Sequence, residues 1–379
     1  MFSFIKKNNS SVEEGKKLSW FNRFILFLNF LSIISLLLSY GARFISPEKF
    51  WPIAFFGIGY PLLFIINCAF ILIWIIQLKK QFLYSTVTIL IGYSSFFSYL
   101  HFNSKKNSEK GIKLISYNCM LFDLYNWSKN ENSRKNIFRT LEVEKPDILC
   151  LQEFYTSENP RSFDNISALK TQLKLPNYFK HYTTTLRKVD HWGMITLSKF
   201  PIISSGIIEF NTKTNNACIY TDLLIETDTV RVYNLHLQSI QFGKDDYKYV
   251  TDVIESKSEE NIEHSRSILK RLKRGFIKRA KQAEIISAHI KKCKYKIIVC
   301  GDFNDTPTSY AYHTVKGKLN DAFMEKGSGL EKTYNGKFPA FRIDNILYSE
   351  GIEALEYKKT EITITDHFPI SLNLRLKNN

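Results

Sequence analysis

The sequence contains little cysteine, and its cysteines are not spaced for a metal site or a disulfide framework. Six cysteines are scattered over 379 residues, without the paired spacing of a zinc site or of a small disulfide-rich scaffold. Cys119, Cys150 and Cys300 end apolar, strand-like runs, where cysteine behaves as a small hydrophobic residue. The redox compartment therefore stays undecided at this level.

Charge is absent from three long apolar runs in the first quarter of the chain, at about 24–42, 51–78 and 82–103. Each run reaches the roughly 20 residues needed to cross a bilayer. No small-residue cleavage site follows the first run, as a signal peptide would require. We therefore expect residues 1–103 to form a multi-pass membrane region with three transmembrane helices and bilayer lipid as its partner. For any single run, a buried core helix is the alternative.

Basic residues near these runs favour one orientation. Lys and Arg are frequent before the first run, and Lys79 and Lys80 separate the second from the third, whereas Arg43 and Lys49 stand alone in the loop between the first and second. By the positive-inside rule, this favours a cytoplasmic N-terminus and a C-terminal domain on the non-cytoplasmic side. Lysines just after the third run oppose this interpretation. The net charge of +16 fits nucleic acid, an anionic membrane surface or plain solubility, and selects none of them.

After a polar linker at 104–110, short apolar runs follow one another to the end of the chain. The runs at 112–118, 146–154, 193–202, 217–227, 230–239, 296–300, 342–349 and 366–376 are typical of strands, and 134–144 is typical of a helix. Many strands with few long helices favour an α+β fold of packed sheets over a doubly wound parallel sheet.

A basic insertion at about 241–292 interrupts this series of strands. Its second half has apolar residues at helical spacing, and the expected polar face includes Lys278, Arg279 and Lys281. The first interpretation is a solvated helix that packs its apolar stripe on the domain. The alternative is a basic lid that meets phosphates or an anionic leaflet.

Polar residues end one strand after another in residues 111–379. They are Asn118, Glu153, His236, Asp302, Asn304, Asp344, Asp366 and His367. Any one of them is commonly structural, but together they indicate a shared site. Carboxylate and amide oxygens without cysteine suit a hard cation such as Mg²⁺ or Mn²⁺. Histidines beside such a site suit stabilisation of a phosphoryl oxygen or proton transfer.

The motifs around these residues resemble the endonuclease/exonuclease/phosphatase superfamily, which includes deoxyribonuclease-like nucleases, sphingomyelinases and inositol polyphosphate phosphatases. In chain order they are SYN, LQEF, NLHL, GDFN, RIDNIL and TDHFPI, within residues 111–377. The resemblance implies a four-layer sandwich, two packed mixed β-sheets flanked by helices, over residues 111–379. It also implies that Glu153, helped by Asn118, holds the metal, and that Asp366 contributes to the metal and water network.

The same resemblance assigns the catalytic roles. Asp302 would orient and deprotonate the attacking water, and Asn304 would fix that geometry. His367 would bind the scissile phosphate with its ring oriented by Asp344, while His236 would face the developing negative charge. We therefore predict a membrane-anchored, divalent-metal-dependent phosphoesterase that hydrolyses a phosphodiester or phosphomonoester of nucleic acid or of a phospholipid headgroup.

Two other functions compete with this prediction. A catalytically inactive, membrane-tethered module that binds phosphate or nucleic acid would not need both a metal carboxylate and a water base, so the intact set of polar residues speaks against it. A transporter would need polar groups within the apolar runs, where Asn29, Asn67 and hydroxyl residues stand. The sequence contains no base-reading motif, so the choice between nucleic acid and lipid stays open.

Overall fold

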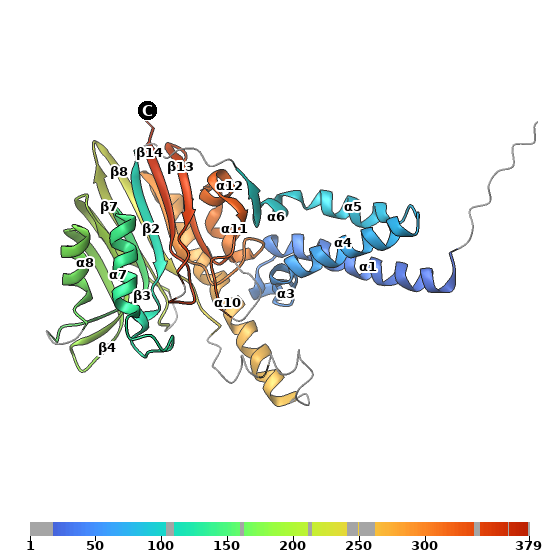
Figure 1. The fold of residues 1–379 in the computed structure, drawn as a ribbon, viewed down its shortest axis with the longest axis horizontal. Coiled ribbons are helices and arrows are strands. Elements are labelled where there is room, and N and C mark those ends of the chain that lie inside the picture. The colour runs from blue at the N-terminus through green and yellow to red at the C-terminus, as the bar shows by residue number, and fades with distance from the viewer. Residues whose placement is uncertain are drawn as a thin grey trace, which may run out of the picture.

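The computed structural model describes residues 18–103, 110–159, 163–210, 214–240, 249, 262–336, 342–362 and 364–377. Figure 1 shows two parts, a bundle of helices built from the first hundred residues and a sandwich of sheets built from the remainder. Part of the predicted insertion, 241–248 and 250–261, and most of the predicted linker lie outside the described residues.

The sandwich is built from two six-stranded mixed sheets. The first has the order β13 (Ile352–Lys359), β14 (Ile370–Leu376), β2 (Ile112–Asn118), β3 (Ile148–Ser157), β5 (Asp190–Ser198) and β4 (Asn177–Leu186). The second has the order β10 (Asn320–Asp321), β12 (Asp344–Tyr348), β9 (Lys296–Asp302), β8 (Asp228–His236), β7 (Ala217–Ile225) and β6 (Ile202–Ile208). Each sheet contains one parallel pair, β2 with β3 and β8 with β9, and its other pairs are antiparallel.

Apolar residues on both faces of the central strands explain the four layers. One cluster, including Leu114, Cys150, Val232 and Ile346, joins residues of the two sheets. A second packs the outer face of the first sheet on α7 (Ser133–Glu144) and α8 (Asn165–Leu173). A third packs the second sheet on α10 (Ile262–Lys292) and α11 (Tyr310–Lys316); the short helix α12 (Ala322–Lys326) adds Phe323 to the first cluster. The predicted fold class of the sandwich is confirmed.

The N-terminal bundle corrects the prediction of three transmembrane helices. One stretch, Trp20–Phe44, comprising α1 (Trp20–Gly41) and the 3₁₀ turn η1 (Ala42–Phe44), is long and apolar enough to cross a membrane. The short helix α2 (Pro47–Phe50) precedes the second run, which is divided into α3 (Ile53–Ile58) and α4 (Tyr60–Ile76). The third run is divided into α5 (Phe82–Ile91) and α6 (Tyr93–Phe97). These shorter helices do not meet that length, so the multi-pass prediction was wrong in this respect.

Glycine and proline explain why the two later runs are divided. The second run carries Pro52, Gly59 and Pro61, and proline lacks the N–H that continues a helix. Gly92 separates α5 from α6, and a Cβ atom there would lie 1.9 Å from the Tyr40 ring of α1. Absence of charge alone therefore overestimated the length of uninterrupted helix.

The interior of the bundle is polar where α1, α4 and α5 meet. Asn29 donates to Ser85 Oγ at 2.7 Å, Ser85 donates to Asn67 Oδ1 at 3.0 Å, and Asn67 donates to Ser32 Oγ at 2.7 Å. Trp74 Nε1 donates to Asn29 Oδ1 at 2.9 Å, and all these side chains are buried. The outward faces are apolar, with exposed side chains that include Phe27, Ile34, Leu62, Ile65, Leu72, Val87 and Leu90.

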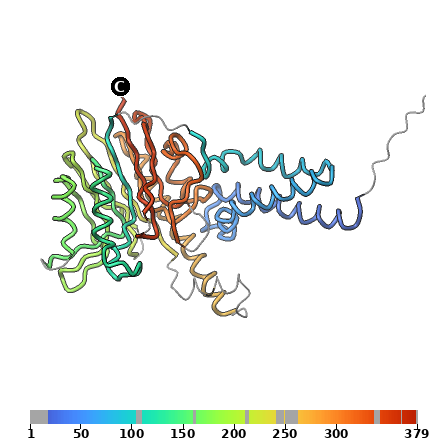
Figure 2. Tube along the Cα trace, viewed as in Figure 1, coloured from blue at the N-terminus to red at the C-terminus, as the bar shows by residue number. Residues whose placement is uncertain are grey.

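Bundle and sandwich are joined by direct contacts, and Figure 2 follows the chain from one to the other. The strand β1 (Leu100–Phe102) pairs with β11 (Ser328–Leu330) in a separate two-stranded sheet. Arg342 Nη1 donates to the carbonyl of Ser98 at 2.9 Å, and Thr308 Oγ1 donates to the carbonyl of Gly57 at 2.8 Å. Arg342 and Thr308 are buried. We call these two hydrogen bonds, together with the β1–β11 pair, the clasp.

Candidate active site

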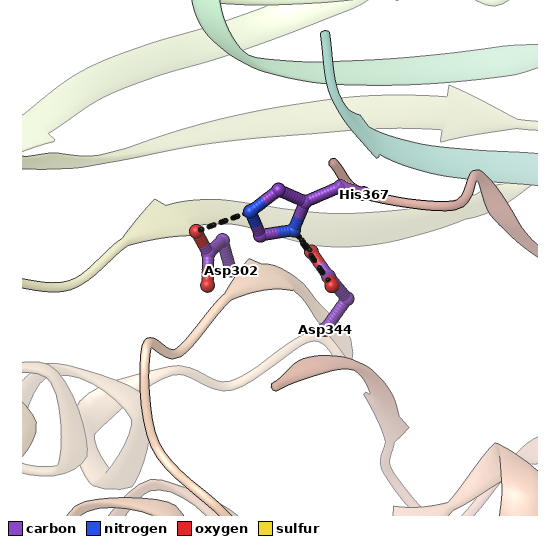
Figure 3. Close-up of side chains that lie close together, drawn as sticks. All are labelled: Asp302, Asp344 and His367. Atoms are coloured by element: carbon purple, nitrogen blue, oxygen red, sulfur yellow. Dashed lines mark hydrogen bonds and ion pairs between the residues drawn. The ribbon is translucent and has the colours of Figure 1, made fainter. Parts of the chain in front are cut away.

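The predicted site residues come together where the ends of strands from both sheets meet. Asn118 and His236 are the last residues of β2 and β8, and Asp302 is the last residue of β9. Asp344 opens β12, which runs antiparallel to β9, and its register partner is Asp302. His367 precedes β14 and lies between Asp302 and Asp344 (Figure 3). The alternation of strand and turn in the sequence therefore places the polar residues of both sheets in one place.

Asp302 is the centre of this arrangement. Its Oδ2 accepts from Asn118 Nδ2 at 3.1 Å and from Asn304 Nδ2 at 3.0 Å, and its Oδ1 accepts from the Asn304 backbone N–H at 2.8 Å. The Nε2 atoms of His236 and His367 lie 3.5 Å and 3.8 Å from Oδ2. The carboxylate is buried, and these hydrogen bonds hold it in a fixed orientation.

The GDFN motif has a local explanation. Gly301 has φ +138°, and a Cβ atom there would lie 1.9 Å from the carbonyl oxygen of Leu235 on the parallel neighbour β8. Any larger residue would therefore separate the strands just before Asp302. Asn304 adopts a left-handed conformation with φ 50°, which asparagine tolerates, and this turns its side chain back onto Asp302.

A bulge in β3 orients Glu153. The register of β3 against β5 shifts between Leu151 and Phe154, and Glu153 has φ 46°. The preceding residue, Gln152, donates to Asn234 Oδ1 of the other sheet at 2.7 Å. Because bulges re-aim side chains, Glu153 leaves the strand pattern and its Oε1 lies 3.8 Å from His236 Nε2. The cross-sheet bond beneath it fixes the separation of the two sheets at the site.

His367 is held as a cation between two carboxylates. Its Nδ1 lies 3.0 Å from Asp344 Oδ2, while Nε2 faces Asp302. Burial lowers the pKa of His367, but the carboxylates of Asp344 and Asp302 outweigh this and raise the pKa well above its usual value. Thr333 Oγ1 accepts from the Asp344 backbone N–H at 3.0 Å. A charged imidazole with a fixed ring suits contact with a phosphate oxygen.

The predicted metal ligands are partly assembled. Glu153 and Asp302 both face His236 Nε2, a buried nitrogen without a hydrogen bond among the described residues. Glu153 is partly exposed, and its oxygen donors are of the type that a hard divalent cation prefers. Asn118 Oδ1 accepts from the Met120 backbone N–H at 3.2 Å. The donor set therefore fits a divalent metal, and Glu153 as its main ligand stays a prediction.

Geometry marks a second possible cation site close by. One ligand atom from each of Asp302, Asp344 and His367 lies within 4.8 Å of the others. The Nδ1 of His367 already contacts Asp344, so that trio is better described as an oriented histidine than as a metal cage. Asp366 is half-buried, with its backbone carbonyl accepting from Asn335 N–H at 2.7 Å; its role in the metal and water network stays a prediction.

A cleft of about 370 Å³ opens beside Glu153 and His236. Its walls are aromatic, aliphatic and neutral polar, namely Leu121, Tyr125, Thr183, Thr184, Leu186, Trp192, Gly193, Asn215, Asn216 and Ser239. Glu153 contributes the carboxylate of this lining and His236 the imidazole.

One residue near the site was misplaced by the sequence interpretation. Arg279 was expected on the solvated face of the basic helix, but its side chain is fully buried. A signal was present, because Arg279 shares helical spacing with Phe276, Ala280 and Ala283, which are buried too. The expected helix itself is confirmed as α10.

Comparison with known proteins agrees with this geometry. The family profile described as the endonuclease/exonuclease/phosphatase family matches residues 115–367. The chain belongs to this family. Membership places the protein among enzymes that hydrolyse phosphate esters. A second profile, a domain of unknown function named DUF8431, matches residues 22–99 in the helix bundle. A search of curated proteins finds no match.

Solved structures of the endonuclease/exonuclease/phosphatase fold are similar to the sandwich. A family member from Beutenbergia cavernae has 15% identity and a TM-score of 0.50, covering 71% of this chain and 72% of that one. The human Nocturnin catalytic domain with bound sulfate has 18% identity and a TM-score of 0.48, covering 72% and 96%. A mannosyl-6-phosphatase from Bacteroides thetaiotaomicron has 18% identity and a TM-score of 0.47, covering 70% and 100%. At these identities the likeness concerns the fold alone.

Proposed function

We propose that the protein is a membrane-anchored, divalent-metal-dependent phosphoesterase that attacks a phosphate ester in line with water. The observation that carries this proposal is the environment of Asp302, a buried carboxylate held by two asparagines and faced by two histidines. A side chain whose task is only to bind phosphate would carry a positive charge. The carboxylate of Asp302 would repel a phosphate, so its presence at the site is explained if it binds the attacking water instead. We therefore assign Asp302 as the base that orients and deprotonates the nucleophile.

The remaining residues complete the reaction around that base. Asn118 and Asn304 hold both oxygens of the carboxylate in a fixed orientation. His367, fixed by Asp344, contacts a phosphoryl oxygen, and His236 faces the charge that develops in the transition state. Glu153, helped by Asn118 and Asp366, would hold Mg²⁺ or Mn²⁺, which neutralises charge on the phosphate when bound.

The helix bundle supports anchoring in a lipid bilayer. Its polar residues point inward and hydrogen-bond to one another, and its outward side chains are apolar. A bundle exposed to water would have the reverse arrangement, because large exposed apolar patches are rare on soluble surfaces. We propose that α1 crosses the bilayer and that α4 and α5 pack beside it in the apolar layer.

Charge at the far end of the bundle supports the predicted orientation. Arg23 at the start of α1 and the turn with Lys79 and Lys80 lie at the end that points away from the sandwich (Figure 1). Basic residues are retained on the cytoplasmic side. The catalytic domain, residues 111–379, would then lie on the non-cytoplasmic side, where its substrates are phosphate esters of nucleic acid or phospholipid headgroups.

A substrate panel tests the proposed function. The full chain in detergent or nanodiscs is incubated with DNA, RNA, phospholipid vesicles, sugar phosphates and inositol phosphates, with Mg²⁺, with Mn²⁺ and with EDTA. We expect hydrolysis of one class, loss of that activity in EDTA and its return with added metal. Full activity in EDTA would contradict the metal assignment, and binding without turnover in every arm would favour the inactive binding module.

A further inference from the structure

Arg279 of α10 connects two of the chain segments that carry proposed catalytic residues in the second sheet. Its side chain is fully buried. Nε donates to Asp305 Oδ2 at 2.9 Å, and Nη1 donates to the backbone carbonyl of Gln238 at 2.9 Å. A buried guanidinium is retained only where its partners are well placed, so the identity of these partners indicates its task.

Both partners lie directly beside catalytic residues. Asp305 follows Asn304, and Gln238 lies two residues after His236. The two segments also touch directly, because Asn304 Nδ2 donates to the Leu237 carbonyl at 3.1 Å. The guanidinium is thus a second and longer bridge between the segment that carries Asp302 and Asn304 and the segment that carries His236.

The helix behind the guanidinium is itself held firmly. Gln282 Oε1 accepts from the Gln238 backbone N–H at 2.8 Å, so α10 contacts this segment at two points. The Arg279 guanidinium lies 5.2 Å from the ring of Phe276, which in turn packs edge-on against Phe55 of α3 at 5.1 Å. The side chain of Arg279 therefore extends to the catalytic segments from a helix, α10, that is itself fixed by these contacts.

We propose that Arg279 is a positioning residue for phosphate-ester hydrolysis. It fixes Asp305 and the Gln238 carbonyl relative to each other, and so keeps His236 and Asn304 at their distances from Asp302. Arginine suits this task because its planar fork donates in two fixed directions, which the single ammonium of lysine cannot do. The proposal rests on the proposed function for its kinetic consequence, whereas its structural consequence can be measured without a substrate.

The chain offers a matched control in the same sheet. Arg231 donates to both oxygens of Asp222, at 2.6 Å and 2.7 Å, in a pair that is largely buried. This pair joins β8 to β7 well before His236 in the chain. Arg231→Met therefore removes a comparable ion pair without releasing the segments around Asp302.

Kinetics of the full chain test the proposal. Arg279→Met, Arg279→Lys and Arg231→Met are compared with the wild type on bis(p-nitrophenyl) phosphate with Mg²⁺, at a temperature where each is shown to be folded. We expect kcat of Arg279→Met to fall about 10- to 100-fold, the usual cost of losing a supporting contact, with little change in KM. Arg279→Lys should lose less, and Arg231→Met should stay within about twofold of wild type. Millimolar guanidinium should restore part of the activity of Arg279→Ala.

Hydrogen exchange provides a readout that is independent of activity. In Arg279→Met, exchange should accelerate at residues 302–308 and 236–240, whereas in Arg231→Met these peptides should match the wild type. Wild-type kcat in Arg279→Met, or unchanged exchange in both peptides, would overturn the proposal. A wild-type protein inactive on every phosphate ester would instead contradict the proposed function, and the exchange experiment would still decide whether Arg279 holds the two segments.

Discussion

The two halves of the molecule use buried polar groups in opposite ways. In the helix bundle, buried asparagines and serines are paired with one another and the apolar side chains face outward. In the sandwich, apolar clusters fill the space between layers, and one group of buried polar side chains surrounds Asp302 at the strand ends. The buried polar side chains of the bundle therefore connect helices to one another, whereas those around Asp302 form the proposed active site.

The largest expected effect comes from Asp302 in the proposed active site. Asp302→Asn keeps the shape of the side chain but removes the base, so turnover should fall by about 10²- to 10⁴-fold, the usual contribution of general base catalysis. Affinity for substrate and the thermal midpoint should change little. The measurement is kcat and KM on the substrate found in the panel, with circular dichroism as the control for folding. Near-wild-type turnover would mean that the buried carboxylate is structural.

The next largest effect comes from His367, and it can be compared with the effect of Asp344, the carboxylate that orients the His367 ring. His367→Ala removes a donor to the phosphate and should lower kcat by about 10²- to 10³-fold. Asp344→Ala leaves the imidazole in place but free to rotate, so its loss should be smaller. Because the two residues act as a unit, the double variant should lose much less than the product of the single losses. Multiplicative losses would show that Asp344 and His367 act independently.

A pair of matched isoleucines tests the outward face of the bundle. Ile34 on α1 and Ile203 on β6 are each 53% exposed. Lysine in the middle of a membrane helix costs about 3 kcal/mol, so Ile34→Lys should reduce the fraction of protein recovered in membranes. Ile203→Lys, on an edge strand that tolerates lysine, should leave that fraction unchanged. Equal behaviour of the two variants would contradict insertion of the bundle into lipid.

The smallest effect concerns the polar interior of the bundle. Asn67→Leu removes the hydrogen bonds to Ser32 and Ser85 and should destabilise the bundle by about 0.6 to 1.7 kcal/mol, the range found for polar contacts between membrane helices. Unfolding in mixed micelles measures the change, with Thr86→Val as the control because the Thr86 hydroxyl donates within its own helix, to the Phe82 carbonyl. Turnover should be unaffected. A loss of turnover at unchanged stability would refute the separation of roles.

Strand-end polar residues made much of the sandwich predictable from sequence. The motifs from Asn118 to His367 lie at strand ends. Their positions could be predicted because an apolar run followed by turn residues marks the end of a strand. The strands β4, β6 and β13 were missed because they are only partly buried. Their alternation of apolar and polar residues is therefore weak.

Other features depend on contacts that a linear pattern does not contain. The length of the apolar runs suggested three spans, but the break at Gly92 follows from the Tyr40 ring against it. Arg279 looked like one more cation of a basic helix; its helical spacing with Phe276 and Ala283 signalled burial, but its hydrogen bond to Asp305 is a tertiary contact that the sequence does not contain. The orientation of Glu153 depends on a bulge whose register involves β5. In each case the sequence gives the type of residue, whereas its contacts in the folded chain cannot be predicted from the sequence pattern.

The clasp determines how far the enzyme can reach. With Arg342 and Thr308 bonded to the bundle and β1 paired to β11, the catalytic centre would have a fixed height and a fixed tilt above a membrane that holds the bundle. An enzyme on a loose tether samples a volume around its anchor point. An enzyme that is rigidly attached to its anchor instead keeps its active site at one distance from the membrane while the anchor diffuses laterally, so the site samples a single layer parallel to the membrane. Its catalytic efficiency would then depend on whether a substrate's phosphate projects to that layer, and a substrate lying deeper or farther out would be spared whatever its chemistry.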